Sequence, residues 1–130
     1  MQSRPAERHV WLRRSAEAIL ALVLVAFGWT HGFVYVEGAS MEPTLSAGDI
    51  VVYRRTATHL ARGDLVLFDH GGSLVVHRVA GVQRDGSLRT RGDANESLDV
   101  LPVAPEAVRG QVVVVVPAGR FTSEVAARLH

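Results

Sequence analysis

The hydrophobic and polar positions divide the chain into two parts with different patterns. Residues 18–36 contain no Asp, Glu, Lys or Arg and are mostly apolar. From residue 37 onward the apolar runs are short and rich in valine, and Gly, Asp and Pro separate them. Short valine-rich runs bounded by turn residues are typical of β-strands. The pattern therefore predicts an N-terminal helix followed by a β domain.

The first apolar run has the length of a membrane-spanning helix. Its 19 residues would extend about 28 Å as a helix, close to the roughly 30 Å of a bilayer core. Trp29 and Tyr35 lie toward its distal end, where amphipathic rings favour the headgroup region. Four arginines precede the run, which predicts a cytoplasmic N-terminus by the positive-inside rule.

A cleaved signal peptide, a twin-arginine signal at Arg13-Arg14 and a buried core helix are the alternatives for this run, and a lone arginine pair is weak evidence. A signal peptide has an apolar region of only about 7–15 residues, and the remaining chain is too short to surround a core helix. We therefore expect residues 18–36 to form one transmembrane helix in the cell membrane. Residues 1–17 would form a cytoplasmic segment, and residues 37–130 an extracytoplasmic domain.

Five strands and one short helix are predicted after residue 37. The five-valine run at 112–116 is too short to cross a membrane and is typical of a strand buried on both faces. A helix over residues 121–129, capped by Thr122 or Ser123, would follow it. The predicted strands are residues 50–54, 65–68, 74–80, 87–91 and 111–116.

The dipeptide Asp85-Gly86 predicts a two-residue hairpin turn between two of these strands. Such a turn would pair His77 with Ala94 and bring the histidine to the level of the polar loop at 92–95. Strand alternation would then point Asp93 away from His77, unless a bulge intervenes, while Asp99 could return through the loop. The pattern leaves open which aspartate approaches the histidine.

Composition excludes several kinds of chemistry. The chain has no cysteine, and all 14 of its basic residues are arginine. A cysteine nucleophile, a thiolate zinc site and a lysine base are therefore impossible. The net charge of +1 is too small for a nucleic-acid-binding surface. The histidines outside position 77 lack ligand spacing, so we expect neither a metal nor a cofactor.

Three short segments carry candidate chemistry, and each is weak evidence by itself. Ser40 precedes a proline-containing turn, where serine is common. His77 lies alone on an apolar strand, as many core histidines do. Asp93 lies in the polar loop RGDAN. Together they offer a hydroxyl nucleophile, a base that can activate it and a carboxylate that can orient the base.

The order of the motifs resembles that of type I signal peptidases. The chain contains SMEPTL, GDIVVYRR, RGDLVLF, VVHRVAG, RGDAN and VRGQVVVVVP in that order. The resemblance implies a mainly β, signal-peptidase-like domain behind a membrane helix. It also implies a membrane-anchored serine endopeptidase that removes signal peptides from exported preproteins and cleaves after small residues, typically at Ala-x-Ala. Its partners would be preprotein signal peptides and the lipid bilayer, with no nucleic acid.

The absence of lysine relates the chain to one branch of that family. The usual bacterial members pair the serine with a lysine, whereas this sequence resembles the endoplasmic-reticulum and archaeal type, which uses histidine. The resemblance implies that Ser40 is the nucleophile, His77 the general base and Asp99 the residue that orients it, with Asp93 as the aspartate of the GD-N motif. Gly38 departs from the family, because a serine there often completes the oxyanion hole.

Two further interpretations stay open at this level. One is a specialised peptidase for a single pilin-like or surface protein. The other is a catalytically silent, membrane-anchored β module, which Gly38 mildly favours and the joint presence of Ser40, His77, Asp93 and Asp99 argues against. The sequence specifies neither accessory subunits nor an oligomeric state.

Overall fold

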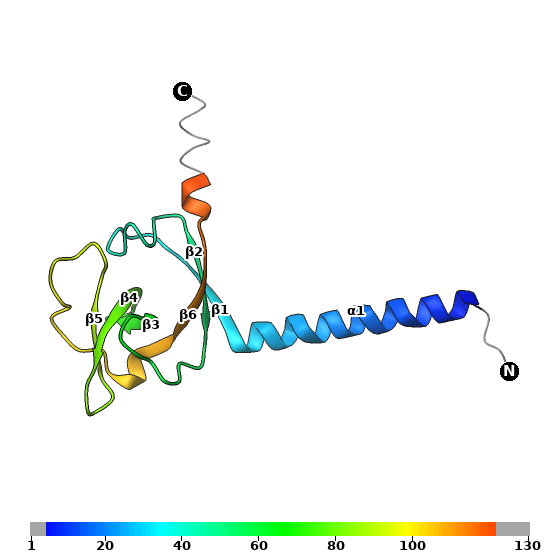
Figure 1. The fold of residues 1–130 in the computed structure, drawn as a ribbon, viewed down its shortest axis with the longest axis horizontal. Helices are drawn as coiled ribbons and strands as arrows, with labels where there is room; N and C mark the ends of the chain where they lie inside the picture. The colour runs from blue at the N-terminus through cyan, green and yellow to red at the C-terminus, as the bar shows by residue number, and fades with distance from the viewer. Residues whose placement is uncertain (1–4, 122–130) are drawn as a thin grey trace, which may run out of the picture. The chain divides into compact units, whose positions relative to one another are not determined.

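The structure, a computed structural model, describes residues 5–121 of the 130-residue chain. The chain divides into two compact units between Thr30 and His31. The first unit contains helix α1 (Pro5–Thr30), and the second contains an antiparallel sheet of six strands (Figure 1). The prediction of a mainly β domain is confirmed. Residues 118–121 are helical, and the rest of the predicted C-terminal helix lies outside the described residues.

Helix α1 ends earlier than the sequence predicts. The expected helix over residues 18–36 is wrong from His31 onward, because His31–Tyr35 form strand β1 and pair with Ile50–Arg54 of β2. At Gly32 a Cβ would lie 2.5 Å from the Tyr53 ring, so the strand packs closely there. Tertiary pairing thus overrides the continuous apolar pattern. Within residues 5–121, no helix combines the length and the apolarity needed to cross a membrane.

The sheet has the strand order β1-β2-β6-β3-β4-β5, with all neighbours antiparallel. All five predicted strands are confirmed, most with slightly different ends, and β1 was not predicted. A short 3-10 helix, η1 (Pro105–Ala107), precedes the last strand. The strands are β1 (His31–Tyr35), β2 (Ile50–Arg54), β3 (Leu65–His70), β4 (Ser73–Val82), β5 (Leu88–Arg91) and β6 (Val108–Val116).

Two apolar clusters form the core of the second unit. One cluster lies on β3, β4 and β5 and the loop before η1. It contains Val66, Phe68, Val79, Leu88 and Val103. The other contains Met41, Leu45 and Val51 and fixes the loop after β1. Burial of each such side chain is worth roughly 1.5–3 kcal/mol. Met41 and Leu45, which follow Ser40 in the sequence, therefore anchor the loop that carries Ser40 to the core.

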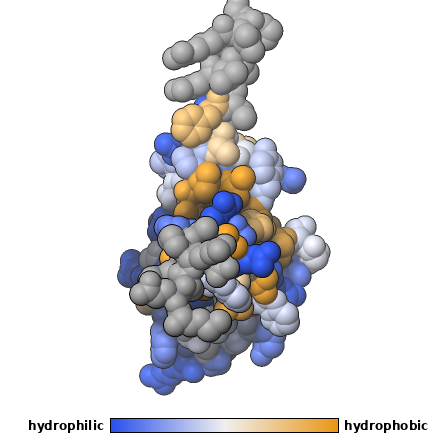
Figure 2. Space-filling view, turned by 90° about the vertical axis from the view of Figure 1, so that its right-hand side faces the viewer, coloured by the Kyte–Doolittle hydropathy of each residue, from blue (hydrophilic) through white to orange (hydrophobic). Residues whose placement is uncertain are grey.

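Strand β6 is less buried than its five valines predict. Val113, Val114 and Val116 are each more than 40% exposed, whereas Val112 and Val115 pack against the second cluster. The prediction of burial on both faces is wrong, because the sheet is covered on one side only at this strand. Figure 2 colours hydrophobic residues orange, and several of them lie at the surface on the face shown.

The hairpin between β4 and β5 has a different turn from the predicted one. Gly86 donates to the carbonyl of Gln83, and Gln83 donates to the carbonyl of Ser87, so the loop contains three residues. Gly86 has a φ of +84°, but Asp85 does not have the positive φ that a two-residue type I′ turn needs. The Asp85 carboxylate instead accepts hydrogen bonds from the Ser87 backbone and hydroxyl.

This turn and a bulge between Val79 and Gly81 shift the register. Arg78 pairs with Arg91, and the predicted pairing of His77 with Ala94 does not form. Strand β5 ends at Arg91, and the chain then runs as a loop past the N-terminal half of β4. The loop still reaches His77 through the contact of Asp99 with Nδ1, although it does not pair with the strand there.

Candidate active site

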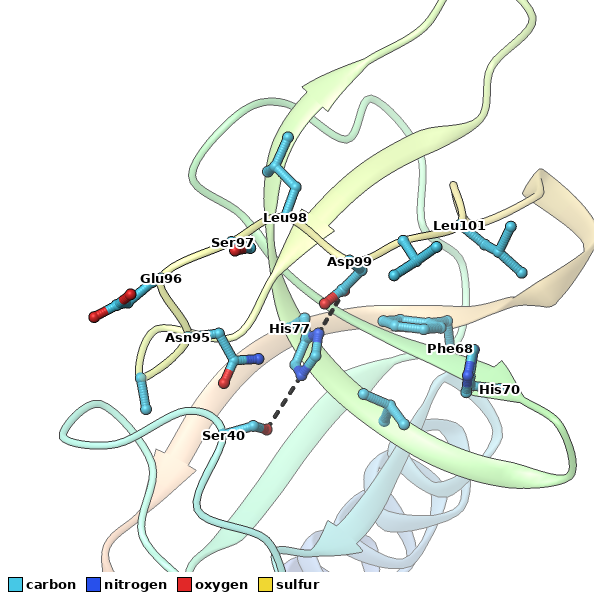
Figure 3. Close-up of a pocket in the computed structure, with 13 residues that line it drawn as sticks. Ser40, Phe68, His70, His77, Asn95, Glu96, Ser97, Leu98, Asp99 and Leu101 are labelled. Carbon is cyan, nitrogen blue, oxygen red and sulfur yellow. Dashed lines mark hydrogen bonds and ion pairs between the residues drawn. The ribbon is translucent and has the colours of Figure 1, made fainter.

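Three separate segments bring Ser40, His77 and Asp99 together (Figure 3). Ser40 lies in the loop after β1, His77 on β4, and Asp99 in the loop after β5. The His77 Nε2 atom lies 3.1 Å from Ser40 Oγ, and His77 Nδ1 lies 2.6 Å from Asp99 Oδ2. These distances form a continuous chain from hydroxyl to imidazole to carboxylate. The arrangement is the one that activates a serine nucleophile in serine peptidases.

Contacts with neighbouring side chains hold the His77 ring in place. His77 is only 8% exposed, and its ring packs edge-on against Phe68, with 6.0 Å between the ring centres. Because Nδ1 faces a carboxylate, we infer that Nδ1 carries the proton. Nε2 then has a free lone pair that accepts the hydroxyl proton of Ser40. The ring is thus prepared to act as a base without rotating.

A buried threonine positions the carboxylate of Asp99. The Thr90 hydroxyl donates to Asp99 Oδ2 at 2.6 Å, and the Asp99 backbone N–H donates to the Thr90 carbonyl at 2.9 Å. Thr90 is fully buried, opposite Val79 on β4. Sequence reasoning missed this residue. Its only signal is a hydroxyl at a buried strand position, where a hydrogen-bond partner must be close.

The structure places Asp93 away from His77. Its carboxylate accepts hydrogen bonds from Arg78 Nε at 2.8 Å and Arg78 Nη2 at 2.6 Å. The Thr44 hydroxyl donates to it as well, at 2.5 Å. This bidentate guanidinium contact lowers the pKa of Asp93 below its ordinary value and raises the pKa of Arg78. Asp93 therefore joins β4 to the loop that follows Ser40. From the sequence, Arg78 is a surface charge or a substrate contact, and its pairing with Asp93 was not predicted, nor was the Thr44 contact.

The loop after β5 fits closely against the loop of Ser40. The Ala94 backbone N–H donates to the Ser40 carbonyl at 2.9 Å, and the Asp93 N–H contacts Met41 Sδ at 3.3 Å. At Gly92, a Cβ would lie 2.5 Å from the Ser40 carbonyl oxygen and 3.1 Å from His77 Nε2. Only glycine leaves this contact undisturbed. The RGDAN motif thus builds one wall of the site.

We expect Asp93→Asn to destabilise the fold. An amide keeps the shape of the side chain but loses the charge that binds Arg78, and a hydrogen bond to a charged group contributes about 1.5–3 kcal/mol. The Arg78 side chain is 37% exposed, and solvent screening reduces the expected loss to about 1–2 kcal/mol. Urea unfolding of wild type and variant at pH 7 measures the difference.

The pH dependence of this difference tests the ion pair itself. The pKa of Asp93 is lowered in the folded protein. Its stabilising contribution is therefore complete above the unfolded pKa of about 3.9 and is lost as the pH falls through the lower folded value. The stability gap between wild type and Asp93→Asn should narrow below about pH 4. A gap that stays constant down to pH 2 would contradict a role for the charge.

A cavity of about 900 Å³ opens beside the three residues. Ser40, His77 and Asp99 line it together with apolar side chains, and these include Phe68, Val75 and Leu98. The adjacent part of β4 has a free edge, because Ser73–Arg78 pair with β3 while β5 pairs only from Arg78 onward. Among the described residues no strand covers this edge. An extended peptide can therefore add to the sheet next to His77.

The four predicted site residues thus separate into two groups. Ser40, His77 and Asp99 meet in one hydrogen-bonded chain, and Asp93 supports the surrounding loop. Their catalytic roles stay a prediction. The backbone N–H of Ser40 donates to no acceptor among the described residues, so it is free for a ligand oxygen. A Cβ at Gly38 would have no neighbour within 4 Å, and the glycine is thus not required for packing.

Comparison with known proteins identifies the family of this chain. The family model described as "Peptidase S24-like" matches residues 26–113, about two thirds of the chain. The protein named "Signal peptidase I W" from Bacillus subtilis (strain 168) is 31% identical over 91 residues. That match covers 65% of this chain and 47% of the relative, so the chain spans about half the relative's length. This protein belongs to the peptidase S24-like family.

Proposed function

We propose that this protein is a serine endopeptidase that removes signal peptides from exported preproteins. The observation that carries the proposal is the hydrogen-bonded chain of Ser40, His77 and Asp99 at the wall of a cavity large enough for a peptide. An intact chain of this kind supports an active enzyme rather than a silent binding module. Ser40 would be the nucleophile, His77 the general base and Asp99 the group that orients the base.

The first half of the reaction follows from these positions. Ser40 Oγ attacks the carbonyl carbon of the scissile bond, and its proton passes to His77 Nε2. The π electrons of the carbonyl move onto its oxygen and form a tetrahedral oxyanion. When the intermediate collapses, the C–N bond breaks and the leaving amine takes the proton from His77. The product is an acyl-enzyme on Ser40.

The second half uses the same groups in reverse. Water replaces the amine, and His77 Nε2 takes its proton as the oxygen attacks the acyl carbon. Collapse of the second tetrahedral intermediate returns the proton to Ser40 Oγ and releases the new carboxyl end. Such proton transfer by a positioned side chain contributes roughly 10²–10⁴-fold to the rate. Nδ1 stays bonded to Asp99 throughout, so the ring keeps its orientation.

The chemistry of the base supports the histidine branch of the family. The chain contains no lysine, so a lysine amine is not available to deprotonate Ser40. His77 Nε2 lies at hydrogen-bond distance from the hydroxyl, and the Nδ1–Asp99 contact fixes its tautomer. These residues support our proposal that the protein is of the endoplasmic-reticulum and archaeal type of signal peptidase.

Two observations support an extended peptide substrate. The free edge of β4 ends at His77, so a peptide added there would present a backbone carbonyl to Ser40. The relative from Bacillus subtilis is named a signal peptidase, which supports preproteins as substrates. Small residues at the −1 and −3 positions follow from the family resemblance. The extracytoplasmic position of the catalytic domain stays a prediction, consistent with substrates that are cut as they leave the cytoplasm.

Cleavage of a preprotein with an Ala-x-Ala site tests the proposal. We expect the full-length protein, purified in mild detergent, to cut such a preprotein once, directly after the second alanine. A preprotein with Trp in place of that alanine should be cut about 100-fold more slowly, because the family resemblance implies a subsite that accepts only small residues at this position. Mass spectrometry of both products identifies the cut.

The possible outcomes test the peptidase activity and the signal-peptide substrate separately. Cleavage at other positions, or equal rates for both preproteins, would leave a peptidase but contradict the signal-peptide assignment. No cleavage of either preprotein, with the protein folded by circular dichroism, would contradict the proposed function.

A further inference from the structure

A serine peptidase needs hydrogen-bond donors for the oxyanion that forms during attack. Two donors usually converge on this oxygen, and they are most effective when fixed before the reaction. The free backbone N–H of Ser40 supplies one donor. Position 38, two residues earlier, is glycine and has no side-chain donor. The side chain at position 38 therefore cannot supply the second donor, and the other groups that line the cavity are the candidates.

The loop after β5 turns sharply at Asn95 and carries its side chain toward the reacting groups. The Asn95 backbone N–H donates to the Gly92 carbonyl at 2.9 Å, which closes the turn. A Cβ built on Gly92 would lie 2.9 Å from Asn95 Nδ2, 3.1 Å from His77 Nε2 and 2.5 Å from the Ser40 carbonyl oxygen. The Asn95 amide nitrogen and the base therefore lie near each other, on the Gly92 side of the Ser40 loop. Figure 3 shows the Asn95 side chain beside Ser40 and His77.

Several other polar groups near Ser40 already have hydrogen-bond partners. The Ala94 N–H donates to the Ser40 carbonyl, and the Thr44 hydroxyl donates to Asp93. Asp99 accepts from His77 and Thr90. In Figure 3 the side chains of Glu96 and Ser97 point away from Ser40, and His70 lies beyond Phe68. The Asn95 amide makes no hydrogen bond to any described residue, although it lines the same cavity as Ser40.

We propose that the Asn95 side-chain amide is the second oxyanion donor, acting with the Ser40 backbone N–H. The inference rests on the proposed serine peptidase function. As the carbonyl electrons move onto oxygen, Asn95 Nδ2–H donates to the negative charge and no proton is transferred. A neutral amide suits this role, because it donates without titrating near neutral pH. Asn95 is exposed in the free protein, and a peptide in the cavity would cover it and strengthen the bond.

Two variants remove the donor in different ways. Asn95→Ala deletes the amide, and Asn95→Asp replaces it with an almost isosteric carboxylate that only accepts hydrogen bonds. Loss of one oxyanion donor typically lowers kcat by about 10²–10³-fold. We expect this loss in both variants on the Ala-x-Ala preprotein, with KM changed by less than about threefold. Gln111→Ala is the matched control, because it deletes a side-chain amide that contacts Arg54 instead and should leave kcat unchanged.

Inhibitor binding distinguishes a donor from a residue that only shapes the loop. A peptide aldehyde forms a tetrahedral adduct with Ser40, whereas the corresponding peptide alcohol binds without one. For Asn95→Ala, the inhibition constant of the aldehyde should rise about 100-fold and that of the alcohol should stay the same. Equal weakening of both inhibitors would overturn the proposal in favour of a structural role.

The cleavage rates of wild type and the Asn95 variants also test the oxyanion assignment. If wild type cleaves the preprotein and both Asn95 variants retain its kcat, the oxyanion assignment is overturned and the peptidase assignment stands. If the folded wild type cleaves nothing, the proposed function fails and this inference fails with it. Thermal unfolding of each variant, compared with wild type, ensures that a loss of kcat is not a loss of folded protein.

Discussion

Ser40→Ala should abolish cleavage while leaving the fold intact. In serine peptidases, removal of the nucleophile lowers kcat by about 10⁶-fold, because the remaining groups cannot form the acyl-enzyme. The Ser40 hydroxyl bonds to His77 Nε2. Its loss should change the free energy of unfolding by about 1 kcal/mol or less. Steady-state cleavage of the preprotein and urea unfolding measure the two quantities on the same sample.

A control on the same loop makes the result specific. Ser46 lies six residues further along, and its backbone N–H, not its hydroxyl, bonds to Asp49. Ser46→Ala should keep kcat within about twofold of wild type. A fluorophosphonate probe should label wild type and Ser46→Ala at one serine per chain and should not label Ser40→Ala. Equal cleavage by wild type and Ser40→Ala would show that Ser40 is not the nucleophile.

The sequence predicts the sheet well where the pattern is local. Strand β2 has the predicted ends, and the other four predicted strands differ by a few residues. Each is a short valine-rich run between turn residues, so its own composition specifies it. Strand β1 fails this rule, because His31–Tyr35 continues the apolar run of the preceding helix without interruption. Its pairing with β2 depends on residues about twenty positions away.

The hairpin between β4 and β5 shows why turn motifs alone do not predict the geometry of the candidate site. The dipeptide Asp85-Gly86 indicates a turn correctly, but the Asp85 carboxylate binds the Ser87 backbone and selects a three-residue loop. A one-residue change in loop length changes every cross-strand pair beyond it. The motif resemblance selects Ser40, His77 and Asp99, whereas strand pairing alone leaves Asp93 and Asp99 open. The choice between them depends on Thr90 and Arg78, which hold the two carboxylates in different places.

Asp99→Asn should therefore be far more damaging to catalysis than Asp93→Asn. In the Asp99 variant, an amide NH₂ facing His77 Nδ1 would favour the tautomer with its proton on Nε2. That nitrogen would then donate to Ser40 instead of accepting its proton. The corresponding change in serine peptidases lowers kcat by about 10⁴-fold. Because Asn keeps the shape of the side chain, the fold should be retained. The Thr90 hydroxyl, which donates to the same Asp99 Oδ2 atom that His77 contacts, would accept a hydrogen bond from the new amide instead.

The two aspartates serve as controls for each other. Asp93→Asn leaves the His77–Asp99 contact in place, so its kcat should fall by no more than about tenfold, while its stability falls through the lost Arg78 charge. Cleavage of the preprotein across pH 5–9 measures both variants. If the Asp99 variant has the wrong tautomer, its rate should rise with pH into the alkaline range, where hydroxide assists deprotonation of Ser40. Equal losses of kcat in the two variants would contradict the assignment of Asp99, because only one of these carboxylates contacts the histidine.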